Sequence, residues 1–222
     1  MNDYLIKMFP LLILFVGCGL VNCYTKAWVA YKLGDRQTKI QGRFSWNPLH
    51  HLDIFGSASL LIFYVGWMKP MQYNYNDLGQ KRYAPLLIEL SGVGANLAMW
   101  IAGGLVYLLL KWLEPVTNLD LRTIKSTVEF FCAFNVFFAL FNLLPIPQLP
   151  GFKLLVGLLY HKPQGVYDSM AITYMGWTLI VILIILTPIL SWLISASSIF
   201  LKLFGMIGRP YFAYFTPFIG GY

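Results

Sequence analysis

Long apolar stretches separated by short polar ones dominate the pattern of this chain. A helix needs roughly 20 apolar residues to cross a bilayer, and several stretches approach or exceed that length. The pattern predicts membrane helices over residues 4–33, 83–112, 126–144 and 170–207. We expect Pro188 to break or bend the last of these, which leaves one span and a helix near the membrane interface.

A shorter apolar stretch, residues 52–68, leads into a polar connection. The pattern leaves open whether this stretch crosses the membrane or forms a short re-entrant or hairpin element over about residues 52–76, and we expect four or five membrane spans in all. The basic loop at residues 34–43 is expected on the cytoplasmic side, because cytoplasmic loops carry an excess of Lys and Arg.

Composition supports a membrane protein. The 222 residues are 58% hydrophobic and only 11% charged, whereas about a quarter of a soluble domain is charged. We therefore expect an all-α polytopic membrane protein with a single membrane domain over residues 1–222. The net charge of +7 favours lipid headgroups as partners, and the basic residues are too few and too scattered to predict nucleic-acid binding.

One proline-rich stretch interrupts the apolar pattern. Residues 141–152 read FNLLPIPQLPGF, so that an apolar run ends at Asn142 and three prolines follow within six positions, before Gly151. The stretch predicts backbone that leaves the helix at membrane depth. Such backbone is tolerated only where it is buried in protein or lines a wet cavity.

Four stretches in order resemble the site-2 protease family of intramembrane zinc metalloproteases, and its small bacterial branch most closely. They read AWVAYKLGDRQTKIQGRFSWNPLHHLDIFG, GWMKPMQYN, SGVGANLA and ALFNLLPIPQLPG. The resemblance covers residues 21–155 and implies a site-2-protease-like helix bundle with a re-entrant 52–68 stretch. A helix or helix pair over about 168–208 would complete it. A multi-pass protein of the bacterial inner membrane is also implied.

The family binds zinc through two His of an H-E-x-x-H motif, whose Glu is the general base, and through a distant Asp. The resemblance places these four residues at Asn22, Cys23, Lys26 and Pro150. None of the four is a residue of the family motif, and the positive charge of Lys26 opposes a dication. We therefore expect no metal and no cofactor.

The resulting functional prediction is a non-enzyme. A catalytically inactive family member would bind or scaffold other integral membrane proteins, and could serve as a subunit of a larger membrane complex. The family's proline loop helps to grip the substrate helix, and small residues let helices approach closely. The predicted residues for contact with a partner helix are Gly92, Gly94, Asn96, Asn142, Pro145, Pro147, Gln148 and Gly151.

Lys26 is an unusual residue inside an apolar segment. One interpretation is that its amine extends to the membrane interface. The other is a structural ion pair with Glu89, which would replace the metal as a cross-link between two helices. Glu129 is a competing partner, although its position near the expected start of a helix also suits the positive end of the helix dipole.

An enzymatic alternative remains open. An active membrane hydrolase could hold a relocated metal with Cys23, His50 or His51, near Asp53. The resemblance weakens this alternative, because His51 and Asp53 match a segment of the family that supplies no zinc ligand. His161 is expected in a solvated loop. A small transporter accessory is a third class, with only Lys26 and Glu89 as charges that could line a path.

Overall fold

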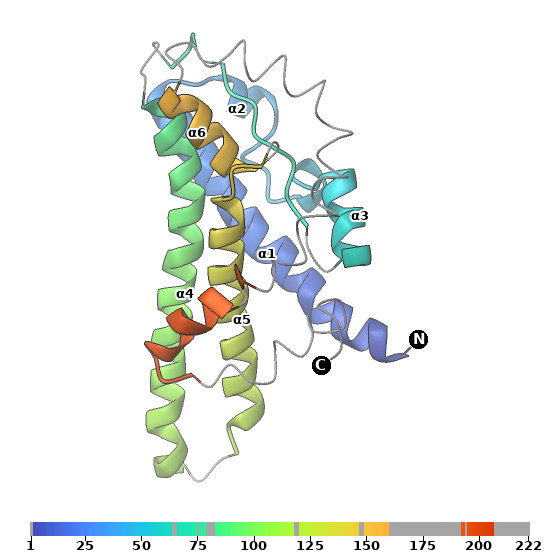
Figure 1. Cartoon of the computed structure of the whole chain (residues 1–222), viewed down its shortest axis with the longest axis vertical. Coiled ribbons are helices and arrows are strands. Elements are labelled where there is room, and N and C mark those ends of the chain that lie inside the picture. The colour runs from blue at the N-terminus through green and yellow to red at the C-terminus, as the bar shows by residue number, and fades with distance from the viewer. Residues whose placement is uncertain are drawn as a thin grey trace. The chain divides into compact units, whose positions relative to one another are not determined.

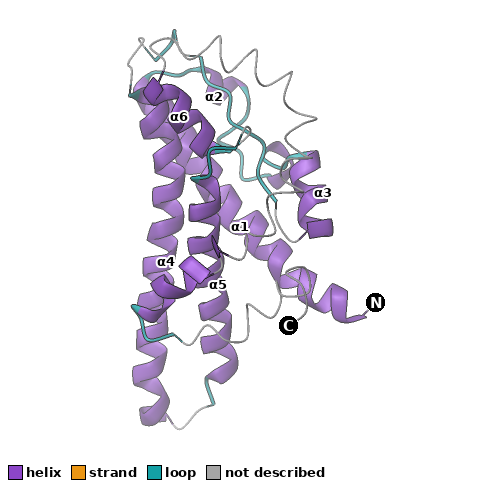
Figure 2. Cartoon of the chain, in the orientation of Figure 1, coloured by secondary structure: helices purple, strands orange, loops and turns teal. Residues whose placement is uncertain are grey.

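Helices and loops make up the described part of the chain (Figures 1 and 2). The structure is a computed structural model of all 222 residues. It describes the residues 2–63, 66–74, 76–78, 83–117, 120–146, 149–159, 192–193 and 195–206. The helices are α1 (Asn2–Leu33), α2 (Gln37–Ile40), a 3-10 turn (Pro48–His50), α3 (Ile54–Phe63), α4 (Ala84–Thr117), α5 (Arg122–Asn142) and α6 (Pro150–Leu159).

Three of these helices contain segments that are long and apolar enough to cross a membrane. They are Phe9–Leu33, Ala84–Pro115 and Arg122–Asn142. The prediction of an all-helical membrane bundle is thereby confirmed. The helices predicted for the last 53 residues lie largely outside the described residues. Of the described residues in this part of the chain, 195–202 are helical.

The apolar stretch at residues 52–68 forms a short element. Helix α3 has 10 residues, which is about 15 Å at a rise of 1.5 Å per residue, so it cannot cross a hydrocarbon core of about 30 Å. After α3 the chain returns, and Met68 forms an isolated antiparallel bridge with Leu52. Asp53 begins α3, because its Oδ1 accepts a hydrogen bond of 2.8 Å from the amide of Gly56.

Helix α1 ends at a glycine. Gly34 has a φ of +115°, and its amide donates to the carbonyl of Tyr31 while the next amide, of Asp35, donates to the carbonyl of Ala30. These two bonds form a Schellman motif, which satisfies the last carbonyls of a helix and requires a left-handed residue. A Cβ at Gly34 would lie 2.8 Å from the carbonyl oxygen of Asp77.

By its contacts the chain divides into two compact units. One comprises Met1–Ala95 and Asn142–Ile184, and the other comprises Asn96–Phe141 and Ile185–Tyr222. A core of small and medium apolar side chains fills the first unit, formed by Ala27, Ala30, Met71, Leu78, Ala84 and Ile88. The core of the second unit is formed by Trp100, Tyr107, Cys132, Ala133, Val136, Leu201 and Met206.

Candidate functional site

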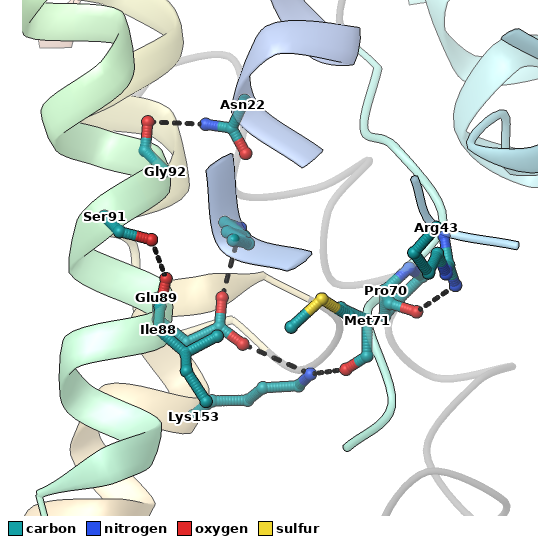
Figure 3. A network of polar contacts seen from close by, with 10 residues as sticks. Asn22, Arg43, Pro70, Met71, Ile88, Glu89, Ser91, Gly92 and Lys153 are labelled. Atoms are coloured by element: carbon teal, nitrogen blue, oxygen red, sulfur yellow. Dashed lines mark hydrogen bonds and ion pairs between the residues drawn. The ribbon is translucent and has the colours of Figure 1, made fainter. Parts of the chain in front are cut away.

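A buried carboxylate in the first unit lies between two lysines. Glu89, on α4, has its Oε2 3.1 Å from Nζ of Lys26 on α1 and its Oε1 3.3 Å from Nζ of Lys153 on α6 (Figure 3). The side chains of Lys26, Glu89 and Lys153 are 9%, 2% and 16% exposed. We call these three residues the charge cluster. It joins three separate helices through one acid, and the structure thus places the predicted Lys26 and Glu89 in contact.

Two cations, the partly buried Lys153 and the buried Arg43, also hold the segment that follows α3. Lys153 donates to the carbonyl of Met71 and lies 5.1 Å from the ring centre of Tyr73. The guanidinium of Arg43 donates to the preceding carbonyl, that of Pro70, at 3.0 Å, and to the carbonyl of His50 at 3.3 Å. Figure 3 shows the bond of Lys153 to Met71 and the bond of Arg43 to Pro70. Because non-helical carbonyls far from water need donors, these cations stabilise the extended backbone at residues 70–71.

Asn22 lies one helical turn before Lys26 on α1, and both side chains contact α4. Its Nδ2 donates to the carbonyl of Gly92 on α4 at 2.8 Å (Figure 3). A Cβ at Gly92 would lie 2.2 Å from Cε of Lys26 and 2.8 Å from Oδ1 of Asn22. Gly92 therefore lets α1 and α4 approach closely, and in this structure α1 covers it. The prediction that it faces a partner helix is corrected to packing within the chain.

The proline loop bends the chain between α5 and α6. The amide of Ile146 donates to the carbonyl of Leu144 at 2.8 Å, so the helix does not continue. Gly151 is buried, and a Cβ there would lie 2.2 Å from the carbonyl oxygen of Leu143. Leu143 and Pro145 remain exposed. The loop is thus fixed by close backbone packing while two of its side chains stay accessible.

The other predicted contact residues divide into exposed and buried ones. Gly94 is exposed, and a Cβ there would meet nothing within 4 Å. Asn142 is buried at the end of α5. Asn96 is buried in the second unit, where its Nδ2 donates to Oδ1 of Asn135 at 3.1 Å. The predictions for Pro147 and Gln148 concern residues outside the described ranges.

The donor set at this site does not fit the zinc ion that the family resemblance implies. Asn22 uses its amide as a donor to a carbonyl, Lys26 is paired with Glu89, and Pro150, buried at the start of α6, has no donor atom in its side chain. Zinc is held in proteins by His, Cys, Asp and Glu. Within the described residues, no three side chains of these types come together in a way that could hold a metal.

The residues of the relocated-metal alternative have other roles. His51 is fully buried, and its Nε2 contacts the carbonyl of Ser45 at 2.8 Å. Burial lowers the pKa of its imidazole below the ordinary value of 6.5. His50 is exposed, Cys23 is half-buried on α1, and Asp53 caps α3. The structure does not bring them together as a metal site.

The alternatives for Lys26 and Glu129 are also resolved. Lys26 is buried and paired with Glu89, so its amine does not extend to the interface. Glu129 belongs to the second unit, two turns into α5 instead of at its start. It is buried and shares a hydrogen bond with the hydroxyl of Tyr107. The expectation that it faces the start of a helix dipole was wrong, because α5 begins at Arg122, earlier than its apolar run.

Sequence reasoning missed two residues of the site, Lys153 and Arg43. A signal for Lys153 was present, because it is the one charged residue in the otherwise apolar stretch 149–159. A lone charge in an apolar helix is expected to find a buried partner. Arg43 gave no such signal, since it lies in a loop with other basic residues.

Comparison with known proteins gives a curated relative. The chain is 30% identical over 194 residues to the protein named Putative zinc metalloprotease YwhC, of Bacillus subtilis (strain 168), and the match covers 83% of this chain and 85% of that protein. No family model matches the sequence. No solved structure matches it significantly. The relative's name describes a protease, and it contradicts the expectation that this chain is not an enzyme.

Proposed function

The chain belongs to the site-2-protease-like family of membrane proteins, and on that premise we propose that it recognises a transmembrane segment of another membrane protein. The proposed contact residues are Leu143, Pro145 and Gly94, which are exposed residues of the proline loop and of α4 in the first unit. The buried residues of the same region, including Gly92 and Gly151, act by shaping the backbone behind them.

The observation that carries this proposal is the geometry of the proline loop. Leu143 and Pro145 expose their side chains directly after a helix long enough to span a membrane, on backbone that has left the helix. The packing of Gly151 against the carbonyls of Leu143 and Leu144 fixes that backbone. A fixed, irregular segment with exposed apolar side chains at the end of a spanning helix suits contact with a second chain, because a locked backbone holds those side chains in one geometry.

The charge cluster supports the site from within. Lys26, Glu89 and Lys153 connect α1, α4 and α6, and α6 follows the proline loop directly. A recognition surface keeps its geometry when the residues beneath it are locked by packing and polar contacts. We propose that the cluster stabilises the proline loop and does not itself contact the recognised membrane protein, which we call the client.

Site-specific photo-crosslinking tests the proposal. A photoreactive amino acid replaces Leu143 or Pro145, and the control carries it at Ile13, an apolar and exposed residue on the spanning part of α1. We expect crosslinks from positions 143 and 145 that map by mass spectrometry to the transmembrane segment of one protein, and none from position 13. Equal crosslinking from all three positions would show random encounters in the bilayer and would contradict the proposal.

Cleavage of the recognised segment is the second candidate, and the name of the relative favours it. The described residues supply no three-ligand set for a metal, so a separate measurement is needed. The crosslinked client, once identified, is co-reconstituted with the purified protein in liposomes, and its intact mass is followed over time. A cleavage product within the transmembrane segment supports this candidate, and an unchanged mass contradicts it while leaving recognition to the crosslinking test.

A further inference from the structure

An open pocket lies at the end of α1. It has a volume of about 510 Å³ and is lined by Tyr31, Arg36, Lys39 and Ile40. All four residues are exposed. Two cations, a phenol and an aliphatic side chain therefore surround one space at the boundary of a segment that is long enough to span a membrane.

Local backbone structure holds the two cations in place. The Schellman motif at Gly34 ends α1 and turns the chain. Helix α2 then begins, with the amides of Lys39 and Ile40 donating to the carbonyl of Arg36 at 3.2 and 3.4 Å. The buried hydroxyl of Thr38 anchors this turn by donating to the carbonyl of Asp35 at 3.1 Å.

The neighbouring acid, Asp35, does not line the pocket. Asp35 is fully buried, and its Oδ1 accepts from the amides of Gln37 at 3.1 Å and Asn74 at 3.4 Å. Burial raises the pKa of this carboxyl, which weakens its tendency to carry a charge. Lys32 adds a further exposed cation in the last turn of α1, 5.7 Å from the ring centre of Trp28.

An aromatic cluster adjoins the pocket. Tyr24 stacks on Trp46 with 4.8 Å between ring centres, and Phe44 makes edge contacts of 5.6 Å with both Tyr24 and Tyr31. Aromatic rings with a polar edge are enriched at the headgroup level of a membrane. The loop that carries Phe44 and Trp46 is thereby fixed against the end of α1 at that level.

Exposed aliphatic side chains also occur outside the three long helices. Ile40, Leu49 and Ile54 are 77%, 76% and 83% exposed. Large apolar side chains with this exposure are unfavourable in water, so Ile40, which lines the basic pocket, indicates contact with lipid there.

We propose that this pocket binds the phosphate headgroup of an anionic phospholipid, with Arg36 and Lys39 on the phosphate and Ile40 against an acyl chain. The guanidinium and the ammonium are both established partners of phosphate. A basic cluster next to a membrane helix is typical of anionic-lipid binding. The inference is independent of the proposed recognition of a transmembrane segment, because the two sites share no residue.

A mixed-micelle titration tests the proposal. The full-length protein in dodecylmaltoside is titrated with dioleoylphosphatidylglycerol, and native mass spectrometry measures the dissociation constant. The variant Arg36→Gln/Lys39→Gln should bind roughly 30-fold more weakly, from about fivefold for each basic residue near a membrane surface. The control Lys111→Gln/Lys202→Gln removes the same charge from exposed positions of the second unit and should bind as the unchanged protein does.

Two further arms separate the source of the phosphate and the role of charge. Inorganic phosphate at millimolar concentration should not displace the lipid, and dioleoylphosphatidylcholine should bind at least tenfold more weakly than the anionic lipid. Equal losses in both double variants would overturn the proposal, since net charge alone would then explain binding. Complete displacement by inorganic phosphate would overturn the assignment to lipid. The single variant Lys39→Gln, with an expected loss of about fivefold, keeps the test valid if the double variant does not fold.

Discussion

Replacing Glu89 by Gln is expected to destabilise the protein strongly, because the change removes the only acid of the charge cluster and leaves two largely buried lysines without the carboxylate they share. Glu89 is 2% exposed, with one lysine nitrogen at 3.1 Å and the other at 3.3 Å. At an effective dielectric constant of about 20, each contact corresponds to a gross attraction on the order of 5 kcal/mol. Desolvation offsets much of this, and removing one partner of a buried ion pair typically costs about 3–5 kcal/mol.

The assay is denaturant unfolding in a mild detergent, followed by intrinsic fluorescence. The free energy of unfolding of Glu89→Gln should fall by about 3–5 kcal/mol. In a double-mutant cycle with Lys26→Met, the two changes should be non-additive by about 1–3 kcal/mol. The matched control is Glu114→Gln, since Glu114 pairs with Lys125 at 2.5 Å but is partly exposed, and it should cost about 1 kcal/mol or less. Additive effects of Glu89→Gln and Lys26→Met would refute the coupling.

The remaining predictions concern packing, backbone and pH. Gly92→Ala should lower the free energy of unfolding by about 1–3 kcal/mol through its clash with Lys26. Gly94→Ala meets only open space inside a helix and should leave it unchanged or raise it by up to about 1 kcal/mol; equal losses in both variants would contradict the packing. Gly34→Ala should cost about 1–3 kcal/mol, measured in the same way, because an Ala at φ +115° is strained. Burial lowers the pKa of His51 in the folded state, so its contribution to stability is present above the unfolded value of about 6.5 and is lost as pH falls through the folded value. The melting temperature should therefore fall on acidification, and it should fall less in His51→Gln.

Much of the helical arrangement could be predicted from the sequence, because bilayer thickness sets the length of an apolar run. The runs at residues 4–33, 83–112 and 126–144 correspond to α1, α4 and α5 within a few residues at most ends. The non-spanning element at α3 was expected from the family resemblance, because the apolar pattern left open whether residues 52–68 cross the membrane. The start of α5 was misplaced by four residues, because polar residues in its first turn hide the beginning of the helix.

The site was only partly predictable. A lone Lys and a lone Glu in two apolar helices predict each other as partners, and the structure places Lys26 beside Glu89. Gly92 and Gly94 look alike in the sequence, yet they are about 200° apart on a helix of 3.6 residues per turn. Which of them faces α1 depends on the rotation of α4, which packing decides. The expectation of a non-enzyme rested on four aligned positions, and the name of a relative that matches most of the chain contradicts it.

A crystal structure grown from lipid in the presence of zinc, with anomalous diffraction recorded at the zinc edge, tests the account most directly. The account predicts that the amines of Lys26 and Lys153 lie within about 4 Å of the Glu89 carboxylate, the ordinary range of an ion pair, and that no anomalous peak appears beside Asn22. A zinc peak at that position, with Lys26 turned away from Glu89, would contradict it.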